Sequence, residues 1–340
     1  MQKYNMLYVV TAFLGLSLLA YALLGGADFG AGIIEIFAGK VTKKTITHAI
    51  APVWEANHMW LILMVVILFM GFPLIYSQLS LYLHIPLLIL LIGIILRGTA
   101  FTFRHYDAII DKSQDHYTFI FKLSSIIAPL FLGIITGAMI LGRIDPNPPT
   151  FYEGFITPWL NSFCIMLGIF TCCLFAFLAA VYLIGEAETP AIRRRFLKIA
   201  RNGNIATVIS GGLVFVFAEL NGFPLAQMFL GSPGTLAAVI LATLSLPLLW
   251  WSLTKQKIVL PRLIAGFQTM MILGAWFWDQ YPAVLRYTDG SYLGLFNTAA
   301  PEATIRQLAL ALLIGSLLIL PALFYLMKIF KGSAFSEDIE

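Results

Sequence analysis

The chain has 340 residues, of which 60% are hydrophobic and only 11% carry a formal charge. Soluble domains average about 45–50% apolar and about 25% charged residues, and a single soluble fold cannot bury so much apolar surface away from water. The composition excludes a soluble globular protein, and the net charge of +4 does not indicate nucleic-acid binding, because the cations lie in short segments between apolar runs.

Nine apolar runs are long enough to cross a bilayer as helices, since about 20 residues span its hydrocarbon core. No internal repeat and no low-complexity linker divides the chain, so we expect a single transmembrane domain over residues 1–340. Pro247 interrupts one run, but membrane helices tolerate a proline where neighbouring groups satisfy the freed carbonyl. The expected spans are 6–34, 57–76, 80–103, 118–142, 159–185, 204–223, 233–253, 259–278 and 305–330.

The first run contains Asp28 within the glycine-rich sequence LLGGADFGAG. The run is too long for the apolar region of a signal peptide and lacks a small-residue cleavage site, so we expect it to remain as a membrane helix. A carboxylate near the bilayer centre costs about 2.5–3.5 kcal/mol on insertion scales, so it normally faces protein or water. Gly26 and Gly30 form a small-xxx-small pair, which lets another helix approach closely.

A second acid, Glu35, follows Asp28 by seven residues on the same helical face. The two acids either form a carboxylate relay that carries protons or are structural acids that accept hydrogen bonds from a neighbouring helix. The sequence leaves both interpretations open.

The second run opens with WEANHMW. Glu55 and His58 are three residues apart and share a helical face, and imidazole titrates near neutral pH, so the pair is suited to proton exchange. The alternative is that Glu55 stabilises the helix N-terminus electrostatically, while Trp54 and Trp60 anchor the helix at the membrane interface.

The third run ends in RGTAFTFRH, which contains Arg97 and Arg104. Arg97 either pairs with Asp28 or Glu55, or extends its guanidinium to the lipid headgroups.

Haem and metal ligands are scarce in the sequence. Of five histidines, only His58 and His84 lie near membrane helices, and we expect them toward opposite faces. A b-type haem needs two axial ligands facing one cavity, so we expect this chain to bind no haem and no metal. Cys164, Cys172 and Cys173 fit no zinc or redox motif and are expected to pack as small apolar side chains.

The basic residues alternate between the two sides of the membrane. Seventeen of the 21 lie in the segments after the odd-numbered spans or at the helix ends that flank these segments, the densest group lying between Arg193 and Arg201. Cytoplasmic segments collect lysine and arginine, so we expect the N-terminus outside and the C-terminus in the cytoplasm. The longest segment expected on the outer side is 279–304.

Several motifs occur in a fixed order along the chain. GGADFGAGI is followed by IAPVWEANHMWLI, GFPLIYS and RGTAFTFRH, and the C-terminal part contains NTAAPEATIRQLALALLIGSLLILPALFYLMKIF. In this order they resemble subunit II of the cytochrome bd quinol oxidases. The motifs span most of the chain, and the first two together are specific to the family.

The resemblance implies an all-α membrane fold of nine helices, arranged as two four-helix bundles plus one peripheral helix. It also implies a haem-bearing partner, subunit I, which carries haems b and d and oxidises quinol, while subunit II binds no haem. Small accessory single-helix subunits, lipid and quinone are further implied neighbours. The complex would reduce oxygen to water in a bacterial or archaeal plasma membrane and generate a proton-motive force, and the isolated chain would not be catalytic.

Site roles follow from the resemblance residue by residue. Asp28 matches the acid of the family's first motif, and Glu55 matches an aspartate of the second motif, of which Asn57 and Trp60 are further constants. In the family these acids are associated with a proton route to the oxygen-reducing haem. We therefore expect a proton path that comprises Asp28, Glu35, Glu55, Asn57 and His58.

Two departures from the family pattern bear on this route. Gly25 stands where some members have a second acid, and Val53 stands where some have a histidine, so the route would run differently here, through His58. The motif residues with expected structural roles are Gly26, Gly30, Trp54, Trp60, Arg97 and Arg104.

The alternative function is that of a secondary transporter. Its glycine-broken first helix would place Asp28 at a midplane ion site. The sequence shows no inverted repeat, which counts against this alternative.

Overall fold

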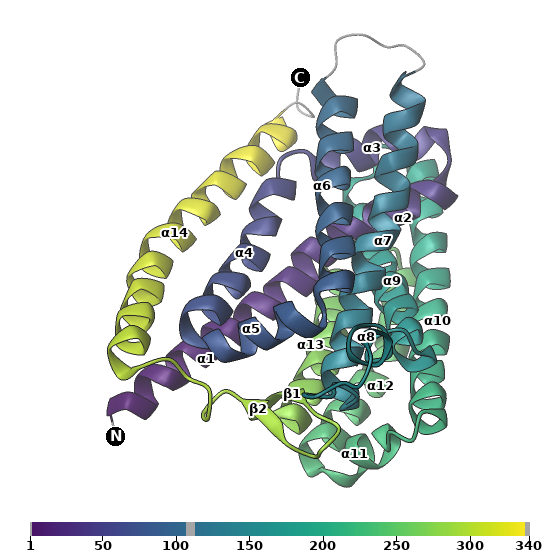
Figure 1. Cartoon of the computed structure of the whole chain (residues 1–340). Helices are drawn as coiled ribbons and strands as arrows, with labels where there is room; N and C mark the ends of the chain where they lie inside the picture. The colour runs from purple at the N-terminus through teal and green to yellow at the C-terminus, as the bar shows by residue number, and fades with distance from the viewer. Residues whose placement is uncertain (1, 107–112, 337–340) are drawn as a thin grey trace.

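The structure of the protein, a computed structural model, describes residues 2–106 and 113–336. Within these ranges nine helical segments are long and apolar enough to cross a membrane, which confirms the number and approximate positions of the expected spans. Apart from one short hairpin and an isolated bridge, the described secondary structure is helical. The chain is therefore an all-helical membrane protein (Figure 1).

The spans and their connections have the following bounds. The first span runs through α1 (Gln2–Ala20), a π-helical turn η1 (Tyr21–Gly25) and α2 (Gly26–Ala38). The other spans are formed by α4 (Trp54–Gly71), α6 (His84–Tyr106), α7 (Ser113–Leu141), α9 (Ser162–Leu183), α10 (Pro190–Leu220), α12 (Pro233–Thr254), α13 (Val259–Gln280) and α14 (Glu302–Ser336). The shorter elements are α3 (Lys40–Ile50), α5 (Pro73–Tyr82), α8 (Phe151–Phe155), the 3-10 turn η2 (Ile184–Glu186), α11 (Leu225–Gly231) and the antiparallel strands β1 (Ala283–Arg286) and β2 (Tyr292–Gly294).

The second and third spans are shorter than expected. Helix α4 ends at Gly71 because Phe72 leaves helical geometry, with φ −137° and ψ 59°, and because Pro73 has no amide hydrogen to continue the helix. Pro73 instead starts α5. The third span consequently begins at His84, several residues after the expected position.

Helix α10 starts earlier than expected. Thr189 accepts a hydrogen bond from the backbone amide of Ile192 as the N-cap, and Pro190 occupies the first turn, an arrangement that favours helix initiation. The basic segment is therefore the beginning of a membrane helix instead of a loop. Pro247 lies inside α12 without ending it.

Helix α9 lies at the centre of the main group of helices, where it packs against α2, α7 and α10. Glycines make these contacts close. A Cβ atom on Gly168 would lie 2.5 Å from the Leu130 carbonyl oxygen of α7, and one on Gly30 of α2 would overlap the backbone of Phe175. Small residues allow such close approach between membrane helices, so α2 is held tightly in the core.

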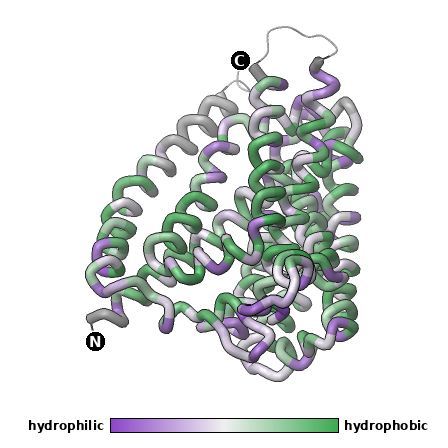
Figure 2. Tube along the Cα trace, in the orientation of Figure 1, coloured by the Kyte–Doolittle hydropathy of each residue, from purple (hydrophilic) through white to green (hydrophobic). Residues whose placement is uncertain are grey.

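Helices α1, α4 and α14 pack together beside this group (Figure 1). Their outward faces carry exposed apolar side chains such as Ile62, Phe69 and Leu317. In Figure 2 hydrophobic residues run along the helices, and hydrophilic residues gather toward the two ends of the molecule. This distribution matches a protein surrounded by lipid along its sides.

The two ends of the molecule differ. At one end the β1–β2 hairpin, which belongs to the expected outer segment 279–304, lies with α8 and α11 (Figure 1). The opposite end carries α3 and the first turns of α10. The polar cluster described next lies toward this second end.

Candidate functional site

The cluster begins where the first span carries its glycines. The π-helical turn places Gly25 against Tyr21, and a Cβ atom on Gly25 would lie 2.8 Å from the Tyr21 ring. Such turns occur frequently at functional sites. Asp28 follows and is buried, while Gly26 and Gly30 face α9. The close helix contact predicted at these two glycines is confirmed.

Two neighbouring helices hold Asp28. Asn57 Nδ2 of α4 donates a hydrogen bond to Asp28 Oδ2 at 2.9 Å. Arg97 Nη2 of α6 donates to the backbone carbonyl oxygen of Asp28 at 2.7 Å, not to its carboxylate. The carboxylate therefore accepts its one recorded side-chain hydrogen bond from a neutral amide.

The Arg97 guanidinium is fully buried between aromatic rings. Its Cζ lies 4.9 Å from the centroid of the Phe29 ring and 5.4 Å from that of Phe121, distances at which a cation is attracted to a ring face. From the sequence, Arg97 is expected to pair with Asp28 or Glu55 or to reach the headgroups. It contacts Asp28, but at the backbone oxygen and not at the carboxylate. Extension to the headgroups is wrong because the side chain has no exposed surface.

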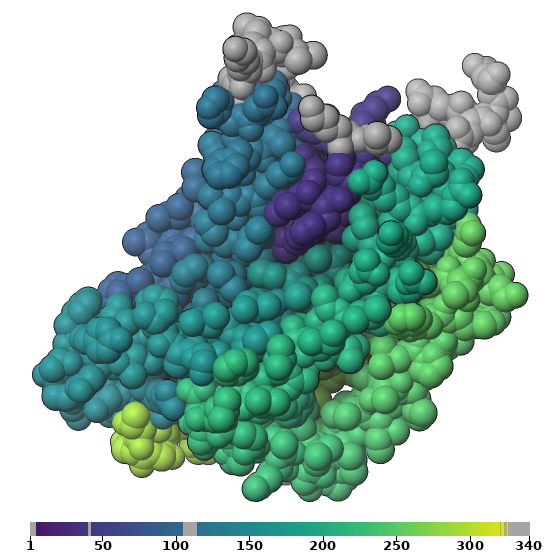
Figure 3. Space-filling view, turned by 90° about the vertical axis from the view of Figure 1, so that its right-hand side faces the viewer, coloured from purple at the N-terminus to yellow at the C-terminus, as the bar shows by residue number. Residues whose placement is uncertain are grey.

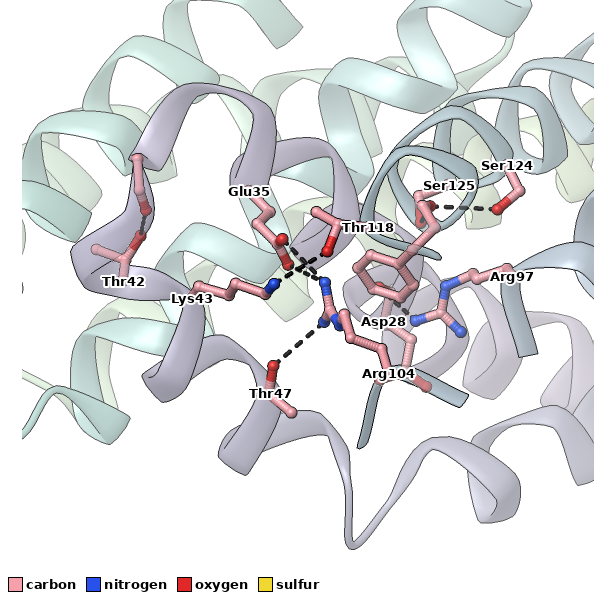
Figure 4. Close-up of polar contacts among 12 residues, drawn as sticks. Asp28, Glu35, Thr42, Lys43, Thr47, Arg97, Arg104, Thr118, Ser124 and Ser125 are labelled. Carbon is pink, nitrogen blue, oxygen red and sulfur yellow. Dashed lines mark hydrogen bonds and ion pairs between the residues drawn. The ribbon is translucent and has the colours of Figure 1, made fainter. Parts of the chain in front are cut away.

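The second acid is held differently. Arg104 Nη1 lies 2.9 Å from Glu35 Oε1 and 2.8 Å from Oε2, and both side chains are almost fully buried. Arg104 Nη2 also donates to Thr47 Oγ1 of α3 at 3.2 Å, and its Cζ lies 4.3 Å from the Phe121 ring centroid. Glu35 is thus fixed in an ion pair that joins α2, α3 and α6 (Figure 4).

The same spacing on two helices produces this arrangement. Asp28 and Glu35 are seven residues apart on α2, as are Arg97 and Arg104 on α6. Because seven residues are close to two helical turns, each arginine reaches one of these residues, Arg104 at the Glu35 carboxylate and Arg97 at the Asp28 backbone oxygen (Figure 4).

Helix α3 closes the cluster at its polar end. Gly39 precedes it with φ +76°, a backbone conformation that glycine adopts readily. Lys43 Nζ donates to Thr118 Oγ1 of α7 at 2.9 Å. Burial, together with the neighbouring Arg104 guanidinium, lowers the pKa of Lys43 below its usual value, while the Glu35 carboxylate opposes this shift.

His58 lies one residue from Asn57 and is surrounded by aromatic rings. Its ring centroid lies 6.2 Å from that of Tyr21, 5.6 Å from Phe29 and 6.4 Å from Trp54. His58 also lines a groove of about 500 Å³ between α4 and α6. The groove is lined by Trp54, His58, Ile94, Ile95, Gly98, Thr99, Thr102 and Phe103.

Glu55 stands apart from the buried acids. It lies in the first turn of α4 and is exposed, with no recorded hydrogen bond or ion pair among the described residues. This position fits the expected electrostatic role at the helix N-terminus and gives no direct contact with Asp28. Trp54, by contrast, packs against the Phe101 ring at a centroid distance of 5.7 Å.

Several buried polar atoms in the cluster have no hydrogen-bond partner among the described residues. Buried polar groups are nearly always hydrogen-bonded, so these atoms have hydrogen-bonding capacity left for ordered water or for a group from another chain. They are Tyr21 Oη, His58 Nδ1, Arg97 Nε and Nη1, and Arg104 Nε.

The sequence did not predict which partner each acid has. The Glu35–Arg104 ion pair and the Asn57–Asp28 hydrogen bond join residues far apart in the chain. The seven-residue spacing shared by the two acids and the two arginines is the sequence signal that identifies the Glu35–Arg104 ion pair. In the described part of the chain, no group of three or more His, Cys, Asp or Glu side chains is placed to hold a metal ion.

Fold and site together define a multi-span helical membrane protein with a buried cluster of acids and arginines beside a glycine-lined helix contact. A sequence model of the family described as cytochrome bd terminal oxidase subunit II matches residues 6–330. The chain belongs to this family. The resemblance seen in the motifs is confirmed, and family membership replaces the secondary-transporter alternative.

Known proteins show the same relationship. Bacillus subtilis (strain 168) cytochrome bd ubiquinol oxidase subunit 2 is 26% identical over 213 residues, which are 59% of this chain and 58% of that protein. Escherichia coli (strain K12) cytochrome bd-I ubiquinol oxidase subunit 2 is 24% identical over 162 residues, 46% of this chain and 42% of that protein. The chain thus matches about half the length of these relatives.

A solved structure extends the likeness to the whole fold. The bd oxidase from Geobacillus thermodenitrificans contains a chain that superposes with a TM-score of 0.75 at 20% sequence identity. The superposition covers 96% of this chain and 98% of that chain, which places the nine-span fold within a known architecture.

Proposed function

We propose that this chain is the haem-free subunit II of a cytochrome bd-type quinol:oxygen oxidoreductase in a bacterial or archaeal plasma membrane. Family membership over residues 6–330 supports this function, as do relatives named ubiquinol oxidase subunits. Its principal partner is subunit I, with small single-helix subunits as further partners. The b and d haems of subunit I supply the oxidation of quinol and the reduction of oxygen.

We further propose that the fold comprises two four-helix bundles and one peripheral helix, α14. The N-terminus lies outside and the C-terminus in the cytoplasm. The gathering of α3 and the basic start of α10 at one end of the molecule supports this orientation, because cytoplasmic segments collect lysine and arginine.

Within the complex, we assign to Asp28 the carriage of protons toward the partner subunit. The observation that carries this assignment is the contrast between the two buried acids. Glu35 is held by two charged hydrogen bonds from Arg104, whereas the Asp28 carboxylate accepts a hydrogen bond from the neutral Asn57 amide. Because no cation among the described residues donates a hydrogen bond to its carboxylate oxygens, Asp28 is the acid that we assign to gain and lose a proton at Oδ1 or Oδ2.

Protons would reach Asp28 from the polar end of α4. Glu55 lies exposed in the first turn, His58 follows on the same helix and lines the groove, and Asn57 contacts Asp28. Proton transfer requires groups within hydrogen-bond reach, directly or through one water. The unpartnered Nδ1 of His58 and Oη of Tyr21 provide sites for such water.

Glu35 has a different role in this proposal. Its ion pair with Arg104 fixes α2 against α6 and, through Thr47, against α3. The pair therefore positions the helix that carries Asp28 and sets the electrostatic environment of the route without carrying protons itself.

The test is Asp28→Asn in the complex co-expressed with subunit I. Asparagine preserves the shape and still accepts a hydrogen bond from Asn57, but it cannot release a proton. Haem content should stay normal, while quinol-driven oxygen uptake should fall by about a hundredfold or more, the effect expected for loss of a proton-transfer group. The control is Glu219→Gln, which makes the same kind of change at an exposed acid near the C-terminal end of α10, away from the polar cluster. It should keep full activity. Full oxygen uptake by a normally assembled Asp28→Asn complex would refute the assignment.

A further inference from the structure

Helix α10 is longer than a bilayer requires. Its 31 residues extend about 46 Å at 1.5 Å per residue, whereas about 20 residues cross the hydrocarbon core. Counting back from its last residue, Leu220, the core-spanning part begins near Arg201. The turns from Pro190 to Arg201 therefore lie at the depth of the lipid headgroups and beyond.

These turns have an inner and an outer face. Ile192, Phe196 and Ala200 are buried against the protein. Arg194, Lys198 and Arg201 are exposed, and their spacing of four and three residues aligns them in one stripe along the helix. The stripe extends about 10 Å, a distance comparable to the thickness of a headgroup layer.

No hydrogen bond or ion pair is recorded among the described residues for the three cations of this stripe, whereas Arg193 and Arg262 nearby each have a partner. Arg193 Nη2 donates to the Gln256 backbone oxygen at 2.9 Å, and Arg262 of α13 pairs with Glu186 at 2.8 Å. For Arg194, Lys198 and Arg201 no ion pair is recorded within the described residues. Like charges at these spacings destabilise a helix unless an anion compensates them.

The same stripe continues as an apolar strip at bilayer depth. Ile205 and Val208 follow Arg201 at the same alternating spacing and are exposed by 41% and 51%. At the next position, Gly212, a Cβ atom would meet no other atom within 4 Å. The space-filling view of this side of the molecule shows α10, in green-teal, crossing the surface from the upper right toward the lower centre (Figure 3).

We propose that this face of α10 binds an anionic phospholipid. The three cations hold the phosphate of the headgroup, and an acyl chain lies along Ile205, Val208 and Gly212. Charge complementarity and the change from cationic to apolar along one stripe fit a molecule that is anionic at one end and apolar along its length. The enrichment of lysine and arginine in cytoplasmic segments explains why this segment is positively charged. It does not explain why the three cations lie in line with the apolar strip.

Lipid binding to the purified full-length protein, with its co-expressed partner, tests the proposal. Native mass spectrometry would compare phosphatidylglycerol with phosphatidylcholine as probes. A basic residue near an anionic surface contributes about fivefold in affinity. The Arg194→Gln, Lys198→Gln, Arg201→Gln triple variant should therefore lose the preference for phosphatidylglycerol by at least about tenfold.

Two controls separate a site from net charge and from misfolding. The Lys44→Gln, Lys255→Gln, Lys257→Gln triple variant removes the same charge from other exposed positions at this end of the molecule and should keep the preference. An Arg194→Lys, Arg201→Lys variant preserves the cations and should also keep it.

Several results would overturn the assignment of an anionic phospholipid to this face of α10. An unchanged preference in the stripe variant, or an equal loss in the charge-matched control, would overturn the proposal. Displacement of the lipid by inorganic phosphate alone would indicate a soluble anion site instead. Failure of a thiol reagent to label a Lys198→Cys variant in the delipidated complex would indicate that protein covers the stripe and would overturn the proposal.

Discussion

At the scale of single residues, Arg97 and Arg104 occupy equivalent positions two turns apart on α6 but bind different atoms. Arg104 contacts both oxygens of the Glu35 carboxylate, whereas Arg97 reaches the backbone oxygen of Asp28. Removing one partner of a buried ion pair leaves the other charge uncompensated in a medium of low polarity. The geometry therefore separates an acid whose carboxylate is paired with a cation from one whose carboxylate accepts its recorded side-chain hydrogen bond from a neutral amide.

Neutralising the fixed acid should weaken the fold. Glu35→Gln leaves the buried Arg104 guanidinium without its counter-charge, which typically costs about 3–5 kcal/mol. We expect little correctly folded protein, and a clear fall in the thermal unfolding midpoint of whatever protein can be purified. A Glu35→Leu, Arg104→Met double variant removes both charges and should recover part of the lost stability. Equal stability of Glu35→Gln and the unaltered chain would contradict the structural role of the pair.

The residues of the site were predictable from sequence to different degrees. Asp28 is conspicuous because a carboxylate inside an apolar run is rare, and Asn57 is identified by its motif. The pairing of Glu35 with Arg104 depends on how α2 and α6 are rotated toward each other, which the apolar periodicity of either helix does not specify. The exposure of Glu55 depends on where α4 begins, at Trp54.

At the scale of elements, hydropathy predicted the nine spans because lipid requires long apolar helices, and the described residues contain all of them. The ends of the helices were less predictable. Pro73 divides one apolar run into the end of α4 and the separate helix α5, and the polar start of α10 is helical through its Thr189 cap. Apolar content alone cannot distinguish a helix that ends from one that continues into the headgroup region.

The close contact between α2 and α9 can be tested by substituting a glycine of α2. Gly30→Ala places a methyl group on the backbone of α9, where neither helix can yield without separating. We expect loss of assembled protein or a large fall in the unfolding midpoint, since overpacking typically costs about 1–3 kcal/mol and occasionally more. Gly15→Ala is the matched control, because nothing lies within 4 Å of the added carbon, and it should be neutral or slightly stabilising. Similar behaviour of the two variants would contradict the close α2–α9 contact.

At the scale of the whole molecule, the distribution of charge supports the proposed orientation. Seventeen of 21 basic residues lie after the odd-numbered spans or at the flanking helix ends, and a C-terminal reporter should therefore be active only if it is of the cytoplasmic type. A fluorescent protein should fluoresce there, and alkaline phosphatase should remain inactive. A fusion within 279–304 should show the reverse pattern and serves as the internal control. Phosphatase activity at the C-terminus would reverse the proposed orientation.

We expect the chain to bind no haem when it is expressed alone. The His58 ring is enclosed by Tyr21, Phe29 and Trp54, and the His84 Nδ1 lies 2.8 Å from the Leu81 carbonyl oxygen at the start of α6. The two rings lie toward opposite ends of the molecule, because the chain crosses it once between them, so they cannot face one haem as axial ligands.

Expressed alone, the chain should give a reduced-minus-oxidised spectrum without haem bands, while co-expression with subunit I should give a haem-bearing complex that retains this chain through purification. Stoichiometric haem in the isolated chain would show that it binds the cofactor itself, and a haem-bearing subunit I that purifies without this chain would remove the basis for a shared proton route.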